Sequence, residues 1–163
     1  MRVKAVIAAE KQIVDAGAWK DGKMPNVAFP LSKSTLNVNA NYRWRCIHFT
    51  AAGGSYRLLV FYRLDLHKCN MYLGRHDGKI MTVIARFEWH GTHEGWHFHV
   101  PKDCDDTGLV AGRTGGCEKR LPQCFEHHRK SSFGVTSDES AYMLALNTFR
   151  LAKPSKQFDL VMQ

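Results

Sequence analysis

Residues Ile80–Val100 read IMTVIARFEWHGTHEGWHFHV, which is two β-rich segments joined by a turn that contains glycine. Apolar side chains alternate with others along both segments, and this period of two is typical of β-strands. In the first segment, Ile80–Trp89, one face is predicted to carry Met81, Val83, Ala85, Phe87 and Trp89. In the second, Gly95–Val100, one face carries Trp96, Phe98 and Val100. We therefore predict an antiparallel hairpin whose apolar face packs into the core.

The other face of this hairpin gathers polar and ionisable side chains. Arg86 and Glu88 come from the first strand, and His97 and His99 come from the second. Side chains on the same face of adjacent strands lie within contact distance of one another. The sequence therefore predicts a cluster of these four residues, partly exposed to solvent, with His93 close by in the connecting turn.

Imidazole is the side chain best able to exchange a proton near neutral pH. In RNA cleavage, one histidine would deprotonate the 2′-hydroxyl and the other would protonate the leaving 5′-oxygen. Arg86 would stabilise the charged phosphorane, and Glu88 would orient an imidazole or act as the base itself. This chemistry requires no cofactor, so the predicted mechanism is metal-independent.

Two other interpretations of the same residues remain open. Polar alternation is what any half-buried strand shows, so the cluster could be a solvated outer face with a structural role alone. His97 and His99 point the same way, so with His90 or His93 they could instead bind a metal ion.

Three further strands are predicted before the hairpin. Residues 42–49, Tyr56–Leu64 and Asn70–Leu73 are rich in β-branched and aromatic residues, and Asp77-Gly78 favours a tight turn into Ile80. The predicted class is α+β: a five-stranded antiparallel meander sheet with a C-terminal helix packed on one face and an N-terminal helix. All of it is expected to form a single domain of residues 1–163.

The two helices are predicted from end signals and composition. Thr136 and Glu139 have capping-box spacing ahead of an apolar segment, which predicts a buried helix over about Ser137–Leu151. Residues Val3–Val14 are rich in helix formers and predict the N-terminal helix, with a strand over Val3–Ala9 as the competing interpretation. Residues 19–41, with their prolines, glycine and asparagines, read as irregular covering structure.

A long polar, glycine-rich loop is predicted over residues 102–134, between the hairpin and the C-terminal helix. Cys104, Cys117, Cys124 and His127 fall within it and could supply four ligands to a structural Zn²⁺. The spacing is irregular and lacks a Cys-x-x-Cys knuckle, so ordinary thiols are the alternative.

Composition limits the classes of function. The 163 residues are about one domain in length, and no stretch approaches the roughly 18 continuous apolar residues of a membrane span. The apolar run Ala5–Ala9 is too short for a signal peptide and the five cysteines are odd in number, so we expect reduced thiols and a cytoplasmic location. A net charge of +8 favours RNA or another polyanion, or an acidic protein, as the partner.

The chain also resembles the TumE-type toxin family of bacterial toxin–antitoxin pairs. The matching pieces, in order, are Tyr56-Arg57-Leu58-Leu59, Arg86-Phe87-Glu88, His97-Phe98-His99-Val100 and the closing helix within Phe133–Phe149. The chain departs from the family at Trp89, where the family tends to have asparagine. The resemblance implies toxicity through an RNA or translation target, neutralised by a cognate antitoxin.

Three functions follow from these patterns. The leading prediction is a toxin-like, metal-independent ribonuclease that uses the cluster on the hairpin. The second is a non-catalytic basic interaction protein, such as an inhibitor or binding module encoded by a mobile element. The third is a hydrolase that depends on a metal bound by histidine. A buried group of His97, His99 and Arg86 would favour an enzyme, whereas a flat exposed histidine face would favour the binding module.

Overall fold

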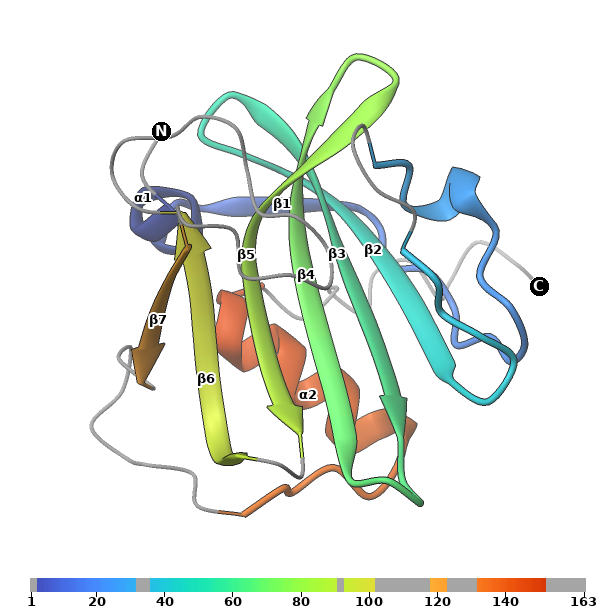
Figure 1. The fold of residues 1–163 in the computed structure, drawn as a ribbon. Coiled ribbons are helices and arrows are strands. Elements are labelled where there is room, and N and C mark those ends of the chain that lie inside the picture. Colours follow the sequence, from blue (N-terminus) through green and yellow to red (C-terminus); the bar gives the residue numbers. More distant parts are fainter. Residues whose placement is uncertain (1–2, 32–35, 91–92, 102–117, 123–131, 152–163) are drawn as a thin grey trace, which may run out of the picture.

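One antiparallel sheet dominates the structure, a computed structural model that describes residues 3–31, 36–90, 93–101, 118–122 and 132–151. Within this part of the chain, seven strands pair in chain order (Figure 1). They are β1 (Lys11–Asp15), β2 (Arg43–Ala51), β3 (Gly54–Arg63), β4 (Lys68–Asp77), β5 (Ile80–His90), β6 (His93–Pro101) and β7 (Glu118–Pro122). The predicted α+β class and the meander order are confirmed.

The predicted number of five strands is wrong, because both edge strands were missed. β1 lies where the N-terminal helix was predicted to continue, and it forms by pairing with the end of β2, from Lys11 opposite Ala51. β7 lies inside the predicted long loop and pairs with β6, from His97 opposite Pro122. Both are short and largely polar, as edge strands often are, so neither has the alternating pattern that identifies a half-buried strand.

The N-terminal helix, α1, covers only Val3–Ala8. Its Val6 and Ile7 side chains are buried in the core. Lys11 then donates hydrogen bonds from Nζ to the carbonyl oxygens of Ile7 and Ala9, at 2.7 and 2.8 Å, which satisfies acceptors at the end of the helix.

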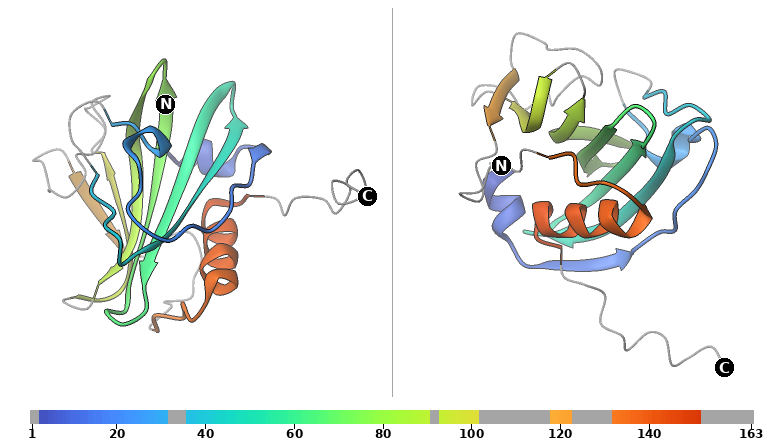
Figure 2. Two further views of the ribbon diagram at one scale, coloured as in Figure 1. Left: turned by 90° about the vertical axis from the view of Figure 1, so that its right-hand side faces the viewer. Right: turned by 90° about the horizontal axis from the view of Figure 1, so that it is seen from below.

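The C-terminal helix, α2, covers Asp138–Phe149 and lies inside the curve of the sheet (Figure 2). Its first turn begins at Ser137, whose hydroxyl accepts a hydrogen bond from the backbone N–H of Ser140, while the Ser140 hydroxyl accepts one from the Ser137 N–H. This capping box lies one residue further along than the predicted pair of Thr136 and Glu139. No helix among the described residues is long and apolar enough to span a membrane.

Both faces of the sheet are covered. The helix-side core contains residues of α1 and α2 packed on strand residues such as Ile47, Leu58 and Met71. A second core lies on the opposite face, where the segment before β2 covers the strands: Met24, Phe29, Val38, Trp44, Leu59, Phe61, Tyr72, Met81 and Val83. Apart from the short 3₁₀ helix Asn26–Ala28, the described part of residues 19–41 is largely irregular, as predicted.

A β-bulge decides which side chains of β5 face each core. The register shifts between Leu73 and Gly74 of β4, which leaves Ile84 as an extra residue on β5. The five side chains predicted to share one face are therefore divided: Met81 and Val83 lie in the second core, and Ala85, Phe87 and Trp89 lie in the helix-side core. This corrects the predicted alternation, and it puts Arg86 and Glu88 on the face away from α2.

Candidate functional site

The buried polar side chains of the described residues all belong to one face of β4, β5 and β6. There are five of them, between 3% and 9% exposed: Asn70, Arg86, Glu88, His97 and His99. We call these residues the polar cluster. Buried polar groups of this kind carry a desolvation cost, so a group of five on neighbouring strands requires a physical explanation.

Strand register brings the cluster together in two adjacent rows. Glu88 of β5 lies between Asn70 of β4 and His97 of β6. Two residues earlier on β5, Arg86 lies opposite His99 of β6. Residues directly opposite one another in an antiparallel pair have Cβ atoms roughly 4.5–5.5 Å apart on the same face of the sheet. The pairing of three strands is thus enough to assemble the site.

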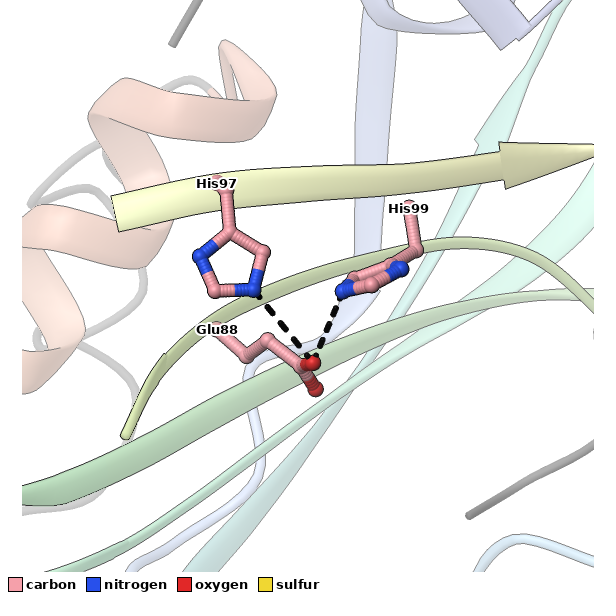
Figure 3. Close-up of side chains that lie close together, drawn as sticks. All are labelled: Glu88, His97 and His99. Carbon is pink, nitrogen blue, oxygen red and sulfur yellow. Dashed lines mark ion pairs between the residues drawn. The ribbon is translucent and has the colours of Figure 1, made fainter. Parts of the chain in front are cut away.

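The two imidazoles converge on a single carboxylate oxygen (Figure 3). His99 Nε2 lies 2.9 Å from Glu88 Oε1, and His97 Nε2 lies 3.6 Å from the same oxygen. The rings of His97 and His99 are 4.9 Å apart between centroids and nearly perpendicular. The ligand-type atoms of all three residues lie within 4.8 Å of one another.

Glu88 is held in its ionised form. Burial raises the pKa of its carboxyl, but hydrogen bonds from His97 and His99, together with the positive charge of Arg86, outweigh burial and hold that pKa well below its ordinary value. A carboxylate therefore persists at neutral pH on a face of the sheet whose remaining core is mainly apolar.

The orientation of His97 is fixed by the backbone. Its Nδ1 lies 3.0 Å from the carbonyl oxygen of Gly95. A carbonyl oxygen only accepts hydrogen bonds, so Nδ1 carries a hydrogen and donates it to Gly95, and Nε2 of the same ring is turned toward Glu88. Gly95 has a φ of 110°, a conformation that favours glycine and lets the chain turn its carbonyl to the ring.

Arg86 supplies the positive charge of the site. Its guanidinium lies over the ring of Tyr72, with Cζ 5.8 Å from the ring centroid. Tyr72 is opposite Arg86 in the β4–β5 register and packs in the second core. The aromatic face thus supports a guanidinium beside Glu88, where it could bind an anionic group of a substrate.

The structure brings together Arg86, Glu88, His97 and His99, four of the five residues predicted as catalytic. The fifth, His93, is the first residue of β6 and pairs with His90, four residues before His97, and its side chain lies outside the described residues.

Sequence reasoning overlooked one member of the cluster. Asn70 was assigned to a strand without a role, although it stands as a polar residue within the otherwise apolar run Cys69–Leu73. Asn70 is recognised as a member of the cluster only from its pairing opposite Glu88. That pairing depends on the β-bulge between β4 and β5.

The predicted zinc site cannot be placed in the fold. Cys104, Cys117, Cys124 and His127 all lie outside the described residues, so that site stays a prediction. The two cysteines within the described residues, Cys46 and Cys69, are free thiols.

No protein-family model, curated protein or solved structure matches this chain. The resemblance to TumE-type toxins therefore stays a prediction, and the functional argument rests on the geometry of the polar cluster.

Proposed function

We propose that this chain is a toxin-like ribonuclease and that the polar cluster is its active centre. The observation that carries the proposal is the buried carboxylate of Glu88 with two imidazole Nε2 atoms turned to it, at 2.9 and 3.6 Å, beside the guanidinium of Arg86. Cleavage of an RNA phosphodiester needs a proton acceptor, a proton donor and a stabiliser of negative charge. The cluster offers all three within one site.

In the metal-independent route, one imidazole removes the proton of a 2′-hydroxyl and the 2′-oxygen attacks phosphorus. The bond from phosphorus to the 5′-oxygen breaks, and the other imidazole, as imidazolium, gives its proton to that oxygen. A 2′,3′-cyclic phosphate and a 5′-hydroxyl result. Arg86 stabilises the phosphorane, and at least one Nε2 must turn away from Glu88 to reach the substrate.

A second candidate is hydrolysis assisted by a metal ion. The observation that favours it is the approach of three ligand-type atoms, from Glu88, His97 and His99, to within 4.8 Å of one another. The two routes share the same residues and the same substrate class, and they differ in what activates the nucleophile.

The non-catalytic binding module is less well supported. A binding module of this kind would place the histidines on a flat, exposed surface. His97 and His99 are instead 3% and 7% exposed, and their Nε2 atoms lie 3.6 and 2.9 Å from Glu88 Oε1. Buried, converging titratable groups are more typical of reaction centres than of docking surfaces.

Charge supports a nucleic-acid substrate. The net charge of +8 would concentrate RNA around the protein. A ribonuclease of the toxin type would act on RNA in the cytoplasm and would be neutralised there by an antitoxin. Such an antitoxin would be a second partner beside RNA.

The test uses purified full-length protein and two versions of one labelled RNA, unmodified and with 2′-deoxyribose at every position. Cleavage of the unmodified strand alone, unaffected by EDTA, is the result expected of the metal-independent route. Cleavage stopped by EDTA and restored by Zn²⁺ or Mn²⁺ assigns the reaction to a metal. If neither strand is cut under either condition, the proposed activity is wrong.

A further inference from the structure

The ligand-type atoms of Glu88, His97 and His99 lie within 4.8 Å of one another, and Glu88 Oε1 lies at about the distance from each histidine nitrogen that separates two ligands of one metal ion. Two ligands bound to a tetrahedral Zn²⁺ at roughly 2.0–2.1 Å stand about 3.4 Å apart. The observed separations from Glu88 Oε1, 2.9 Å to His99 Nε2 and 3.6 Å to His97 Nε2, lie on either side of that value. Small side-chain movements would therefore bring all three atoms onto one ion.

The hydrogen bond of His97 to the backbone is the arrangement found around metal-binding histidines. Such histidines almost always donate their second ring N–H to a carbonyl or carboxylate, which fixes the ring and leaves the other nitrogen to the metal. His97 Nδ1 has this partner in the carbonyl oxygen of Gly95, at 3.0 Å. Nε2 is thereby held 3.6 Å from Glu88 Oε1, a position from which an imidazole nitrogen and a carboxylate oxygen can bind the same cation.

Asn70 provides an independent observation. Its side chain is 5% exposed, and Nδ2 has no hydrogen-bond partner within the part of the chain that the structure describes. It lies opposite Glu88 on the same face of the sheet. An unsatisfied buried donor destabilises the fold, and a water or an anion bound at the metal would accept the hydrogen bond that this donor lacks.

From these observations we infer that Glu88, His97 and His99 bind a divalent transition-metal ion of the zinc class, with Asn70 hydrogen-bonded to the ligand in its open position. The metal charge exceeds that of the one carboxylate, and the neighbouring Arg86 adds another positive charge. The open position therefore favours an anion, such as hydroxide or a phosphate group. This inference does not rest on RNA cleavage.

The test titrates the metal-stripped full chain with Co²⁺ alone and follows visible absorption, which reports tetrahedral Co²⁺ directly. A single ion per chain is expected, with affinity reduced at least about 100-fold in Glu88→Gln, His97→Ala and His99→Ala. His76→Ala, a histidine of β4 outside the cluster, should bind Co²⁺ as the unaltered chain does. Binding that is unchanged in all three cluster variants, or no binding at all, overturns the inference.

One control and one alternative measurement complete the test. A variant with Cys104, Cys117 and Cys124 replaced by serine must keep the Co²⁺ spectrum, and loss of the spectrum in this variant would assign the ion to the cysteines instead. If a cluster variant fails to fold, nitrogen NMR of the unaltered chain takes its place: Zn²⁺ should shift Nε2 of His97 and His99, and unshifted signals contradict the site.

Inorganic phosphate tests the open position. Adding it to the Co²⁺-bound chain should change the visible spectrum, and Asn70→Ala should bind Co²⁺ normally while losing at least about tenfold in phosphate affinity. An unchanged response in Asn70→Ala overturns the role of Asn70. Metal binding without RNA cleavage would refute the proposed ribonuclease and leave this site intact, and RNA cleavage in EDTA without metal binding would do the reverse.

Discussion

At the scale of single residues, the site depends on polar groups placed where apolar ones would stabilise the fold more. Glu88 and Arg86 occupy positions of β5 that face the second core, whose other members are mainly apolar. Removing such charges from water costs free energy that their mutual attraction only partly offsets. Groups of this kind are a frequent mark of functional sites, since a reaction needs them in a fixed, water-poor place.

Asn70→Leu gives a prediction at this scale. Leucine has the same number of side-chain heavy atoms, also branched at Cγ, and it removes the Nδ2 donor that has no partner among the described residues. We expect the free energy of unfolding to stay the same or to rise by about 1 kcal/mol, because an unsatisfied buried donor is replaced by an apolar group. Urea denaturation measures this. A loss of more than about 2 kcal/mol would show that the amide is structurally required.

At the scale of elements, the sequence predicts that alternate side chains of the hairpin share a face. It does not predict the β-bulge, which changes this alternation within β5. The period-two pattern of Ile80–Trp89 reads as one uninterrupted strand. The extra residue at Ile84 arises from pairing with β4 and the close approach at Gly74, which are tertiary contacts. Arg86, Glu88, His97 and His99 could still be grouped correctly, because all four lie on the same side of the bulge.

Gly74 is the residue whose substitution tests the close packing beside this bulge. A Cβ built there would lie 2.7 Å from Met81 Cε and 2.8 Å from Phe29 Cζ. We expect Gly74→Ala to lower the free energy of unfolding by roughly 1–3 kcal/mol through overpacking. Adding Phe29→Leu, which removes the ring, should recover part of the loss, as a double-mutant cycle by chemical denaturation would measure. Purely additive effects would contradict the predicted contact.

The junction of α2 with the sheet predicts how stability depends on pH. Hydrogen bonds from Arg43 and then Tyr62 hold the pKa of Asp138 below its ordinary value despite partial burial, with the Tyr62 hydroxyl 2.5 Å from Oδ1. A carboxyl whose pKa is depressed by folding stabilises the protein above its unfolded pKa of about 3.9 and loses that contribution as pH falls through the folded value.

Asp138→Asn should therefore cost about 1 kcal/mol at pH 7, since the group is partly exposed, and should flatten the decline in stability below about pH 5. Thermal unfolding of both proteins between pH 7 and pH 3 measures the difference. If the stability difference between the two proteins became larger as the pH falls, this explanation would be contradicted.

At the scale of the whole molecule, charge predicts how RNA is bound. A chain with net charge +8 releases counterions when it binds a polyanion, so its affinity should fall at least about tenfold between 50 and 200 mM salt. Fluorescence anisotropy with a labelled single strand measures this. His97→Ala should show the same salt dependence as the unaltered chain, because 22 of the 23 lysines and arginines that attract RNA lie outside the cluster. Affinity that does not change with salt would favour an apolar protein interface instead.

The overall architecture was predictable to the extent that it rests on local patterns. All five predicted strands are found in the sheet, as β2 to β6, and the capped helix is found as α2. β1 and β7 were not predictable, because each forms mainly by pairing with an edge that the sequence does not mark. The burial of the histidines was also missed. The alternation of side chains along a strand predicts which face of the sheet a residue occupies. It does not predict burial, because the residues that cover that face come from other parts of the chain.

That burial changes what a substitution of the histidines is expected to do. His97 and His99 are buried partners of Glu88, so truncation to alanine leaves a charged group with fewer partners and should lower the free energy of unfolding by roughly 2–4 kcal/mol. Activity must therefore be compared at temperatures where each variant is fully folded.

The most direct test of the polar cluster as the reaction centre is the cleavage rate of one defined RNA by His97→Ala, His99→Ala and the matched control His76→Ala. The two cluster variants are expected to lose about 10²–10⁴ in rate while still binding RNA, and the control is expected to keep its rate. If folded His97→Ala and His99→Ala cleave RNA as fast as the unaltered chain, the polar cluster is not the reaction centre.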